Sequence, residues 1–169
     1  MKKIIALTLI LSLVLCGCGA SRYELVDITF TVPASWDADG PFVDADGRDV
    51  YAFYLLDDLL SPRFIDVSSA NIEEGADAES EIESAINWYV YREVNGVPCS
   101  TGSVEVAGVQ GKYFDGRVRY NEDGWAHQLV TVFVIESRLY KVVYTAHFDP
   151  MDDKDYKVYN RLIDSIKVQ

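Results

Sequence analysis

The sequence is poor in cysteine, histidine and methionine. Of its 169 residues, three are cysteine, two are histidine and two are methionine. Cys16 and Cys18 both lie at the end of an apolar N-terminal run, so only Cys99 is left for a folded domain. A disulfide framework of the kind that holds small secreted proteins together is therefore excluded. We expect the stability of the domain to come from packing.

Basic residues are also scarce. The chain has 15 Lys and Arg residues against 27 Asp and Glu residues, and a formal net charge of −12. A surface of this sign repels nucleic acid and anionic lipid headgroups, so we expect neither as a partner. The chain also lacks a glycine-flanked nucleophilic serine and a glycine-rich phosphate loop followed by lysine. These absences argue against serine hydrolases and nucleotide-binding proteins, and no cofactor is expected.

The N-terminal segment has the features of a secretory signal. Lys2 and Lys3 precede the apolar run 4–15, which is too short to span a bilayer comfortably. The sequence Leu15-Cys16-Gly17-Cys18 then resembles the lipobox of bacterial lipoproteins, in which a small residue precedes the lipidated cysteine. Gly17 meets that requirement for Cys18. We predict that residues 1–17 form the signal and that Cys18 is lipidated; the alternatives are a plain secretory signal and an N-terminal membrane helix.

The lipobox resemblance implies a location outside the cytoplasm. A diacylglyceryl group with a further N-acyl chain gives a stable membrane anchor, whereas a single acyl chain binds only marginally. Residues 18–22 are predicted to be a short lipidated tether. Residues 23–169 are then predicted to form a single domain, close against the extracytoplasmic face of the cell membrane. In a host with two membranes, Gly19 after the cysteine favours the outer membrane.

The first half of the mature chain predicts a β-meander. Apolar residues alternate over 23–33, which indicates one half-buried strand. Residues 37–49 are polar and acidic, contain two Asp-Ala-Asp-Gly repeats, and are predicted to be a loop. Residues 50–56 and 64–72 predict two further strands.

The second half of the chain predicts two helices and four strands. Asp77 is a suitable N-cap for a helix that runs to about Glu93, and Asp149, followed by Pro150, is a suitable N-cap for a C-terminal helix. The connections between the four strands are short, so neighbours are expected to pair antiparallel. These strands are predicted at residues 103–107, 110–120, 125–136 and 138–148.

The last predicted hairpin is apolar on both faces. With a turn at Ser137-Arg138, Leu129 and Tyr140 share one face, and Val130 and Val143 share the other. A sheet that is apolar on both faces has to be covered on both sides, and the two predicted helices are available for this. The sequence therefore predicts an α+β fold, an antiparallel β-sheet sandwiched between helices.

The two histidines are unsuited to a shared metal site. His127 and His147 lie on neighbouring predicted strands, but in this register they point to opposite faces of the sheet. A two-histidine metal site is not expected.

Three segments carry a family resemblance over nearly the whole mature chain. They are Tyr23 to Trp36 (Tyr-Glu-x-x-x-Ile-Thr-Phe-x-Val-Pro-x-x-Trp), Val106 to Phe114 (Val-x-Gly-Val-x-Gly-Lys-x-Phe) and Leu162 to Lys167 (Leu-Ile-Asp-Ser-Ile-Lys). Together they resemble the PsbP-like α/β/α sandwich superfamily, which includes the extrinsic photosystem II subunit and the DcrB-type bacterial lipoproteins. The resemblance implies the sandwich fold and a non-enzymatic binding or assembly role. It supplies no catalytic motif, so no catalytic residue is carried over.

The acidic segment 37–49 is a candidate for a weak cation site. Asp37, Asp39, Asp44 and Asp46 supply hard oxygen ligands of the kind that calcium prefers. The spacing does not fit the EF-hand template, and the alternative is a solvated acidic loop. Apart from this candidate, no metal site is predicted.

Two aromatic residues are candidates for an interaction patch. Trp88 and Tyr91 lie off the apolar stripe of the helix predicted at 77–93, and exposed aromatic patches mark interaction sites. The alternative is that both rings pack at the edge of the core.

These features favour a membrane-anchored binding or assembly module without enzymatic activity. Its partner is expected to be a protein or a small ligand, in addition to the membrane that Cys18 contacts through its lipid. The alternative is a cell-envelope hydrolase that uses Cys99 or a site centred on His127. A catalytic cysteine needs a positioned base, which the sequence does not indicate near Cys99.

Overall fold

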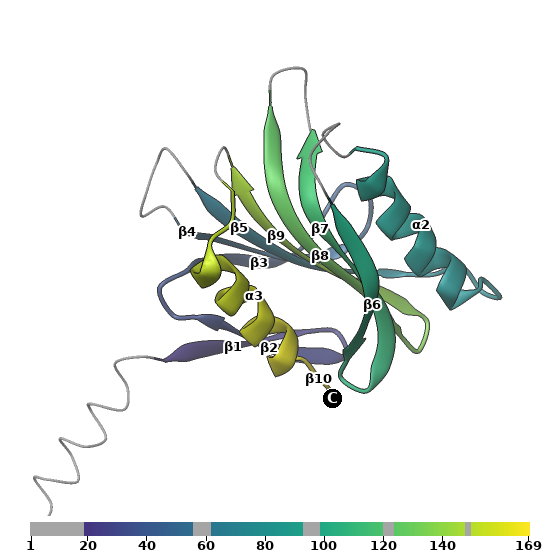
Figure 1. Cartoon of the computed structure of the whole chain (residues 1–169). Helices are drawn as coiled ribbons and strands as arrows, with labels where there is room; N and C mark the ends of the chain where they lie inside the picture. Colours follow the sequence, from purple (N-terminus) through teal and green to yellow (C-terminus); the bar gives the residue numbers. More distant parts are fainter. Residues whose placement is uncertain (1–18, 56–61, 93–98, 120–123, 148–149) are drawn as a thin grey trace, which may run out of the picture.

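The computed structural model describes residues 19–55, 62–92, 99–119, 124–147 and 150–169 (Figure 1). The predicted signal at 1–17 and the predicted lipidation site Cys18 lie outside these residues. Within them, an antiparallel seven-stranded sheet has the order β3-β4-β5-β9-β8-β7-β6, and a smaller sheet has the order β1-β2-β10.

The strand bounds are as follows. The main sheet contains β3 (Asp37–Val43), β4 (Asp49–Leu55), β5 (Arg63–Asn71), β6 (Ser100–Val106), β7 (Val109–Arg119), β8 (Trp125–Ile135) and β9 (Arg138–His147). The small sheet contains β1 (Ala20–Leu25), β2 (Ile28–Pro33) and β10 (Lys167–Val168).

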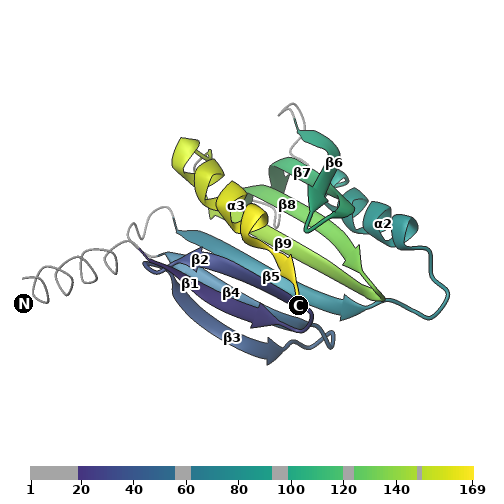
Figure 2. The same ribbon diagram turned by 90° about the horizontal axis from the view of Figure 1, so that it is seen from below.

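Two helices cover opposite faces of the main sheet (Figures 1 and 2). One face packs against α2 (Ala78–Val90), which contacts β7, β8 and β9. The other face is covered by α3 (Asp153–Ser165) together with β1 and β2. This arrangement confirms the predicted antiparallel sheet sandwiched between helices. The contribution of the small sheet to the cover was not predicted.

Each helix is defined by an acidic cap and one apolar stripe. The Asp77 side chain accepts a hydrogen bond from Ser80 N at 3.0 Å, as predicted, and Ile82, Ile86 and Tyr89 form the buried stripe of α2. The N-cap of α3 is Asp152, not Asp149. Asp152 and Asp155 form a reciprocal capping box that fixes this start.

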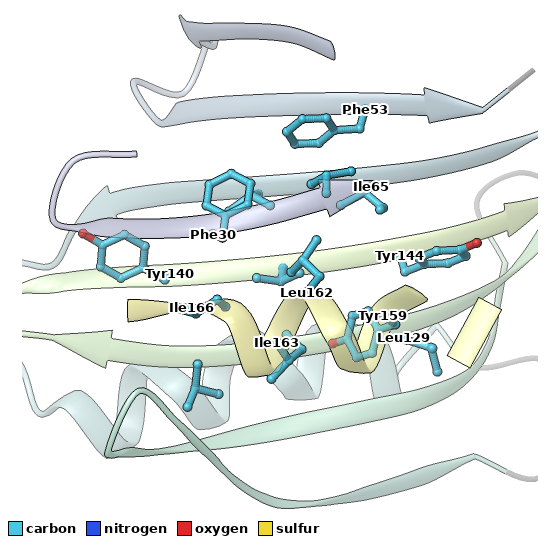
Figure 3. Packing of buried hydrophobic residues seen from close by; sticks show 14 of the residues in the cluster. Phe30, Phe53, Ile65, Leu129, Tyr140, Tyr144, Tyr159, Leu162, Ile163 and Ile166 are labelled. Atoms are coloured by element: carbon cyan, nitrogen blue, oxygen red, sulfur yellow. The ribbon is translucent and has the colours of Figure 1, made fainter. Parts of the chain in front are cut away.

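The larger of two apolar clusters lies between the main sheet and the layer made by α3 and β2. Phe30, Tyr140 and Leu162 are each at most 1% exposed there (Figure 3). The second cluster lies beneath α2 and includes Ile86 and Val130. The predicted division of the hairpin's side chains between two faces is confirmed, because β8 and β9 pair Leu129 with Tyr144 and Val130 with Val143. The turn is Glu136-Ser137, one residue earlier than predicted.

The predicted single strand at 23–33 is wrong. The segment contains a tight turn, because β1 and β2 pair antiparallel with Leu25 opposite Ile28. Val26 sits in the turn at a φ of 54° and is 46% exposed, whereas Leu25 points into the core. The apolar alternation continued through this turn, and Val26-Asp27 lacks the glycine that usually marks a two-residue hairpin turn.

Two other predicted boundaries also differ from the structure. Residues 37–43 form the edge strand β3, not a loop; all seven are exposed, so the strand has no apolar alternation to reveal it. Residues 20–22 belong to β1 and pair with β2, so they are not part of a tether.

Candidate binding groove beside α2

An open groove of about 590 Å³ lies along α2. Its floor comes from β5 and β9, one wall from α2, and the other wall from the turn that joins β3 to β4. This size falls within the range of about 300–1,000 Å³ that is typical of small-molecule sites. The lining residues are Asp46, Arg48, Ser68, Ala70, Ser84, Ala85, Trp88, Tyr89, Leu139 and Lys141.

The charged residue Lys141 lies on the floor of the groove, and Asp66 lies beside it on the same face of the sheet. Lys141 lies opposite Ser68, and Asp66 is two residues from Ser68 on the same face of β5. Burial lowers the pKa of Lys141 and raises the pKa of Asp66, and in both cases burial is the largest cause. Among the described residues, neither side chain makes a hydrogen bond or an ion pair within 4.0 Å. For both groups the effect of burial on the pKa exceeds that of the opposite charges nearby, so the folded state disfavours the charged form of each.

Tyr89 of α2 lines the groove and lies near Asp66. It is 5% exposed, and burial raises the pKa of its phenol, with the nearby Asp66 carboxylate adding to the effect. Its ring packs on Phe114 with centroids 5.7 Å apart, which fixes the depth of α2 over the sheet.

Arg48 stabilises the turn between β3 and β4 that forms the second wall of the groove. The Asp44 carboxylate accepts hydrogen bonds from Arg48 Nε at 2.6 Å and from the backbone nitrogens of Asp46 and Arg48, both at 3.0 Å. Asp46 lies 3.0 Å from the same guanidinium group. The hydrogen bond from Arg48 is the main reason why the pKa of Asp44 is lowered.

The structure does not gather the four predicted cation ligands. Asp44 and Asp46 contact Arg48, which supplies the positive charge that a cation would otherwise bring. Asp37 and Asp39 lie on β3, paired with Tyr54 and Ala52 of β4. No group of three or more acidic, histidine or cysteine residues able to hold a metal ion occurs in the described part of the chain.

The two candidate aromatic residues are both exposed but lie in different surroundings. Trp88 is 51% exposed and lines the groove, and the Arg92 guanidinium lies 4.2 Å from the centroid of its ring. Tyr91 is 90% exposed and is not among the groove residues. The structure therefore assigns only Trp88 to the groove.

The two residues of the enzymatic alternative, Cys99 and His127, lie on opposite faces of the main sheet. His127 lies on the face of the sheet that α3 covers, where its Nδ1 accepts from Met151 N at 3.2 Å and its Nε2 lies 2.7 Å from Asp115 Oδ1. Since Nδ1 accepts, Nε2 must carry the proton and donate it, so both nitrogens are occupied. Cys99 packs with the cluster beneath α2, on the opposite face. The sheet separates the two side chains, and they cannot form a cysteine–histidine pair.

Sequence reasoning missed Asp66 and Lys141. The signal available in the sequence was that both are charged residues within strands of a sheet that was predicted to be covered by helices. Periodicity shows which side chains share a face, but it does not show how much of that face one helix covers, so the uncovered part beside α2 could not be predicted.

Comparison with solved structures establishes the type of fold. Cyanobacterial PsbP (CyanoP) from Synechocystis sp. PCC 6803 superposes with a TM-score of 0.59 at 15% identity, covering 90% of this chain and 94% of that one. LpqN of Mycobacterium tuberculosis, described as involved in cell envelope biogenesis, gives 0.56 at 14% identity, covering 90% and 92%. The chain has the PsbP-like fold.

A crystal structure from Bacteroides thetaiotaomicron VPI-5482 extends the PsbP-like comparison. It gives a TM-score of 0.55 at 13% identity, and the match covers 88% of this chain but about half, 48%, of that one. No protein-family model and no curated protein matches the chain in sequence. In the described residues, no helix combines the length and apolar character needed to cross a bilayer.

Proposed function

We propose that this PsbP-like protein is a lipid-anchored, extracytoplasmic binding module that holds its ligand in the groove beside α2 and performs no chemistry on it. The observation that carries the proposal is Lys141, whose half-buried side chain lines an open groove and donates no hydrogen bond to a described residue. Such a group is available to donate hydrogen bonds to a bound ligand.

The position of the groove supports this role. The Gly19 carbonyl accepts a hydrogen bond from Ala34 N at 3.0 Å, and Ala20 begins β1, so only Gly19 separates Cys18 from the folded sheet. A lipid on Cys18 would therefore hold this end of the domain against the membrane. In Figures 1 and 2, α2 lies at the opposite end of the domain from the start of β1. The groove would then face away from the bilayer, toward molecules of the envelope.

The likeness to LpqN supports a place in the cell envelope, which is the compartment that its description names for that protein. The opposite placement of Cys99 and His127 argues only against a hydrolase that would combine these two side chains.

Site-specific photo-crosslinking in cells tests the groove. A photoreactive residue in place of Ser84, which lines the groove, is compared with one in place of Asp164, an exposed residue of α3. We expect a discrete adduct at Ser84 that disappears in a Trp88→Ala background, and none at Asp164. Equal adducts at both positions, or an adduct at Ser84 that Trp88→Ala leaves unchanged, would contradict the proposal.

The anchor is tested separately by fractionation and mass spectrometry. We expect the wild-type protein in the membrane fraction, with a diacylglyceryl group on an N-terminal Cys18, and Cys18→Ala outside that fraction. A mature protein that begins at another residue, or a Cys18→Ala variant that is still cleaved and membrane-bound, would refute lipidation at Cys18.

A further inference from the structure

We infer that the groove beside α2 takes a hydroxyl-rich ligand, a sugar of one or two rings, and not a simple ion. This inference rests on the proposed function and names the chemical class of the ligand.

The charges around the groove nearly balance, which disfavours an ionic ligand. Arg48, Lys141 and Asp46 line the groove, and the charges of Arg92, Asp44 and Asp66 lie beside it. An anion would be attracted by Lys141 and Arg48 but repelled by the carboxylates of Asp66, Asp44 and Asp46, all of which act on the charge of Lys141. A cation would be attracted by these carboxylates but repelled by Lys141 and Arg48. The mixture of signs therefore selects a neutral molecule with polar groups.

The hydrogen-bonding groups in the groove call for a partner that both donates and accepts. The ammonium group of Lys141 can only donate, and the carboxylate of Asp46 on the turn wall can only accept. The hydroxyls of Ser68 and Ser84 do either, and both line the groove. A sugar presents several hydroxyls, each able to donate and accept, so one ring can satisfy all of these groups at once.

Trp88 adds a surface for the apolar side of a sugar ring. Its indole is half exposed at the groove. The Arg92 guanidinium lies over the ring, 4.2 Å from its centroid, and the Tyr89 ring makes a T-shaped contact with centroids 4.8 Å apart. A large, flat, preordered ring loses little conformational freedom when a ligand packs on it. The volume of about 590 Å³ leaves room for one or two sugar rings but not for a folded domain.

Binding measurements on the full-length protein test the ligand class. The protein is purified in a detergent without a sugar headgroup, and binding is measured by saturation-transfer NMR and calorimetry. The probes are glucose, N-acetylglucosamine, maltose, inorganic phosphate and the tripeptide Glu-Ala-Glu. We expect at least one sugar to bind, and phosphate and the tripeptide to bind at least about tenfold more weakly, a difference of about 1.4 kcal/mol.

Matched variants connect binding to the groove. Trp88→Ala and Lys141→Met should each weaken sugar binding about tenfold. Tyr91→Ala and Lys154→Met, which change exposed residues of the same types outside the groove, should leave it unchanged. Thermal unfolding of each variant confirms that it is folded.

The alternative outcomes separate this inference from the proposed function. Binding of phosphate or the tripeptide that depends on Trp88 and Lys141 would overturn the sugar class and support the groove as a site. Sugar binding that neither variant weakens would overturn the assignment to the groove. Absence of binding by every sugar in the panel, with adducts still formed at Ser84, would overturn the sugar class alone.

Discussion

Asp155 is the buried acid on which the α3 end of the domain depends most. It is 6% exposed, and its Oδ1 accepts hydrogen bonds from Tyr144 Oη at 2.6 Å and from Arg63 Nε at 3.1 Å. Its Oδ2 accepts from the backbone nitrogen of Asp152 at 3.0 Å, which completes the capping box of α3. One carboxylate thus connects the helix start to β5 and β9.

Asp155→Asn keeps the shape of this side chain but changes its chemistry. The amide nitrogen replaces Oδ2 and faces the backbone N–H of Asp152, so two donors oppose each other, at a cost of about 1–3 kcal/mol. The hydrogen bonds from Tyr144 and Arg63 lose their charged acceptor, which adds about 1 kcal/mol. We expect the free energy of unfolding to fall by about 2–4 kcal/mol, equivalent to a decrease in Tm on the order of 10 °C.

Urea unfolding of the full-length protein, followed by tryptophan fluorescence, measures this change. Trp36 reports on the region, since its ring packs on that of Tyr144 with centroids 5.6 Å apart. The control is Asp153→Asn, an exposed acid in the same helical turn, which should cost no more than about 0.5 kcal/mol. If the two variants had equal stability, the assigned role of Asp155 would be refuted.

Three further predictions concern the core, the groove and the sheet. Leu162→Ala on α3 and Ile86→Ala on α2 remove side chains that are 1% and 2% exposed. Each should lower the free energy of unfolding, measured in urea, by about 2–5 kcal/mol. A decrease below about 1 kcal/mol for either variant would show that its helix does not cover the sheet as described. Burial raises the pKa of Asp66 above 3.8, so the folded state binds a proton more readily than the unfolded state and stability falls as the pH rises from near 4 through the folded pKa. Asp66→Asn should therefore be more stable than the wild type at pH 7, with the difference shrinking toward pH 3 in urea titrations; a variant that is less stable at pH 7 would contradict the uncompensated burial of this charge. Gly111→Ala places a methyl group 2.5 Å from the carbonyl oxygen of Val132 on the adjacent strand, so it should lower stability by about 1–3 kcal/mol; a neutral outcome in thermal unfolding would contradict that close approach.

The sequence could predict the sandwich because its evidence is local. The cap at Asp77, the stripe at Ile82, Ile86 and Tyr89, and the two-sided apolar hairpin all depend on residues near one another in the chain. The hairpin turn at Val26 and the edge strand β3 were missed for a shared reason. In each, the usual pattern is missing: the turn at Val26 has no glycine and leaves the apolar alternation unbroken, and β3 is an edge strand with every residue exposed.

The candidate site was only partly predictable. Trp88 could be found, because a residue off the apolar stripe of a helix is visible in the sequence. Lys141 and Asp66 could not be related to it, since their closeness depends on the register between β5 and β9 and on where α2 stops covering the sheet. The predicted cation ligands failed to gather because Arg48, four residues from Asp44, pairs with the nearest two.

The most direct measurement is NMR mapping of the isotope-labelled full-length protein during titration with an extract of the bacterial envelope. If the groove beside α2 is the binding site, amide shifts will concentrate at residues 84–89 of α2, at Ser68 and at Lys141, and they will vanish in Trp88→Ala. Shifts that concentrate around Tyr156 and His127 beneath α3, or that persist in Trp88→Ala, would contradict it.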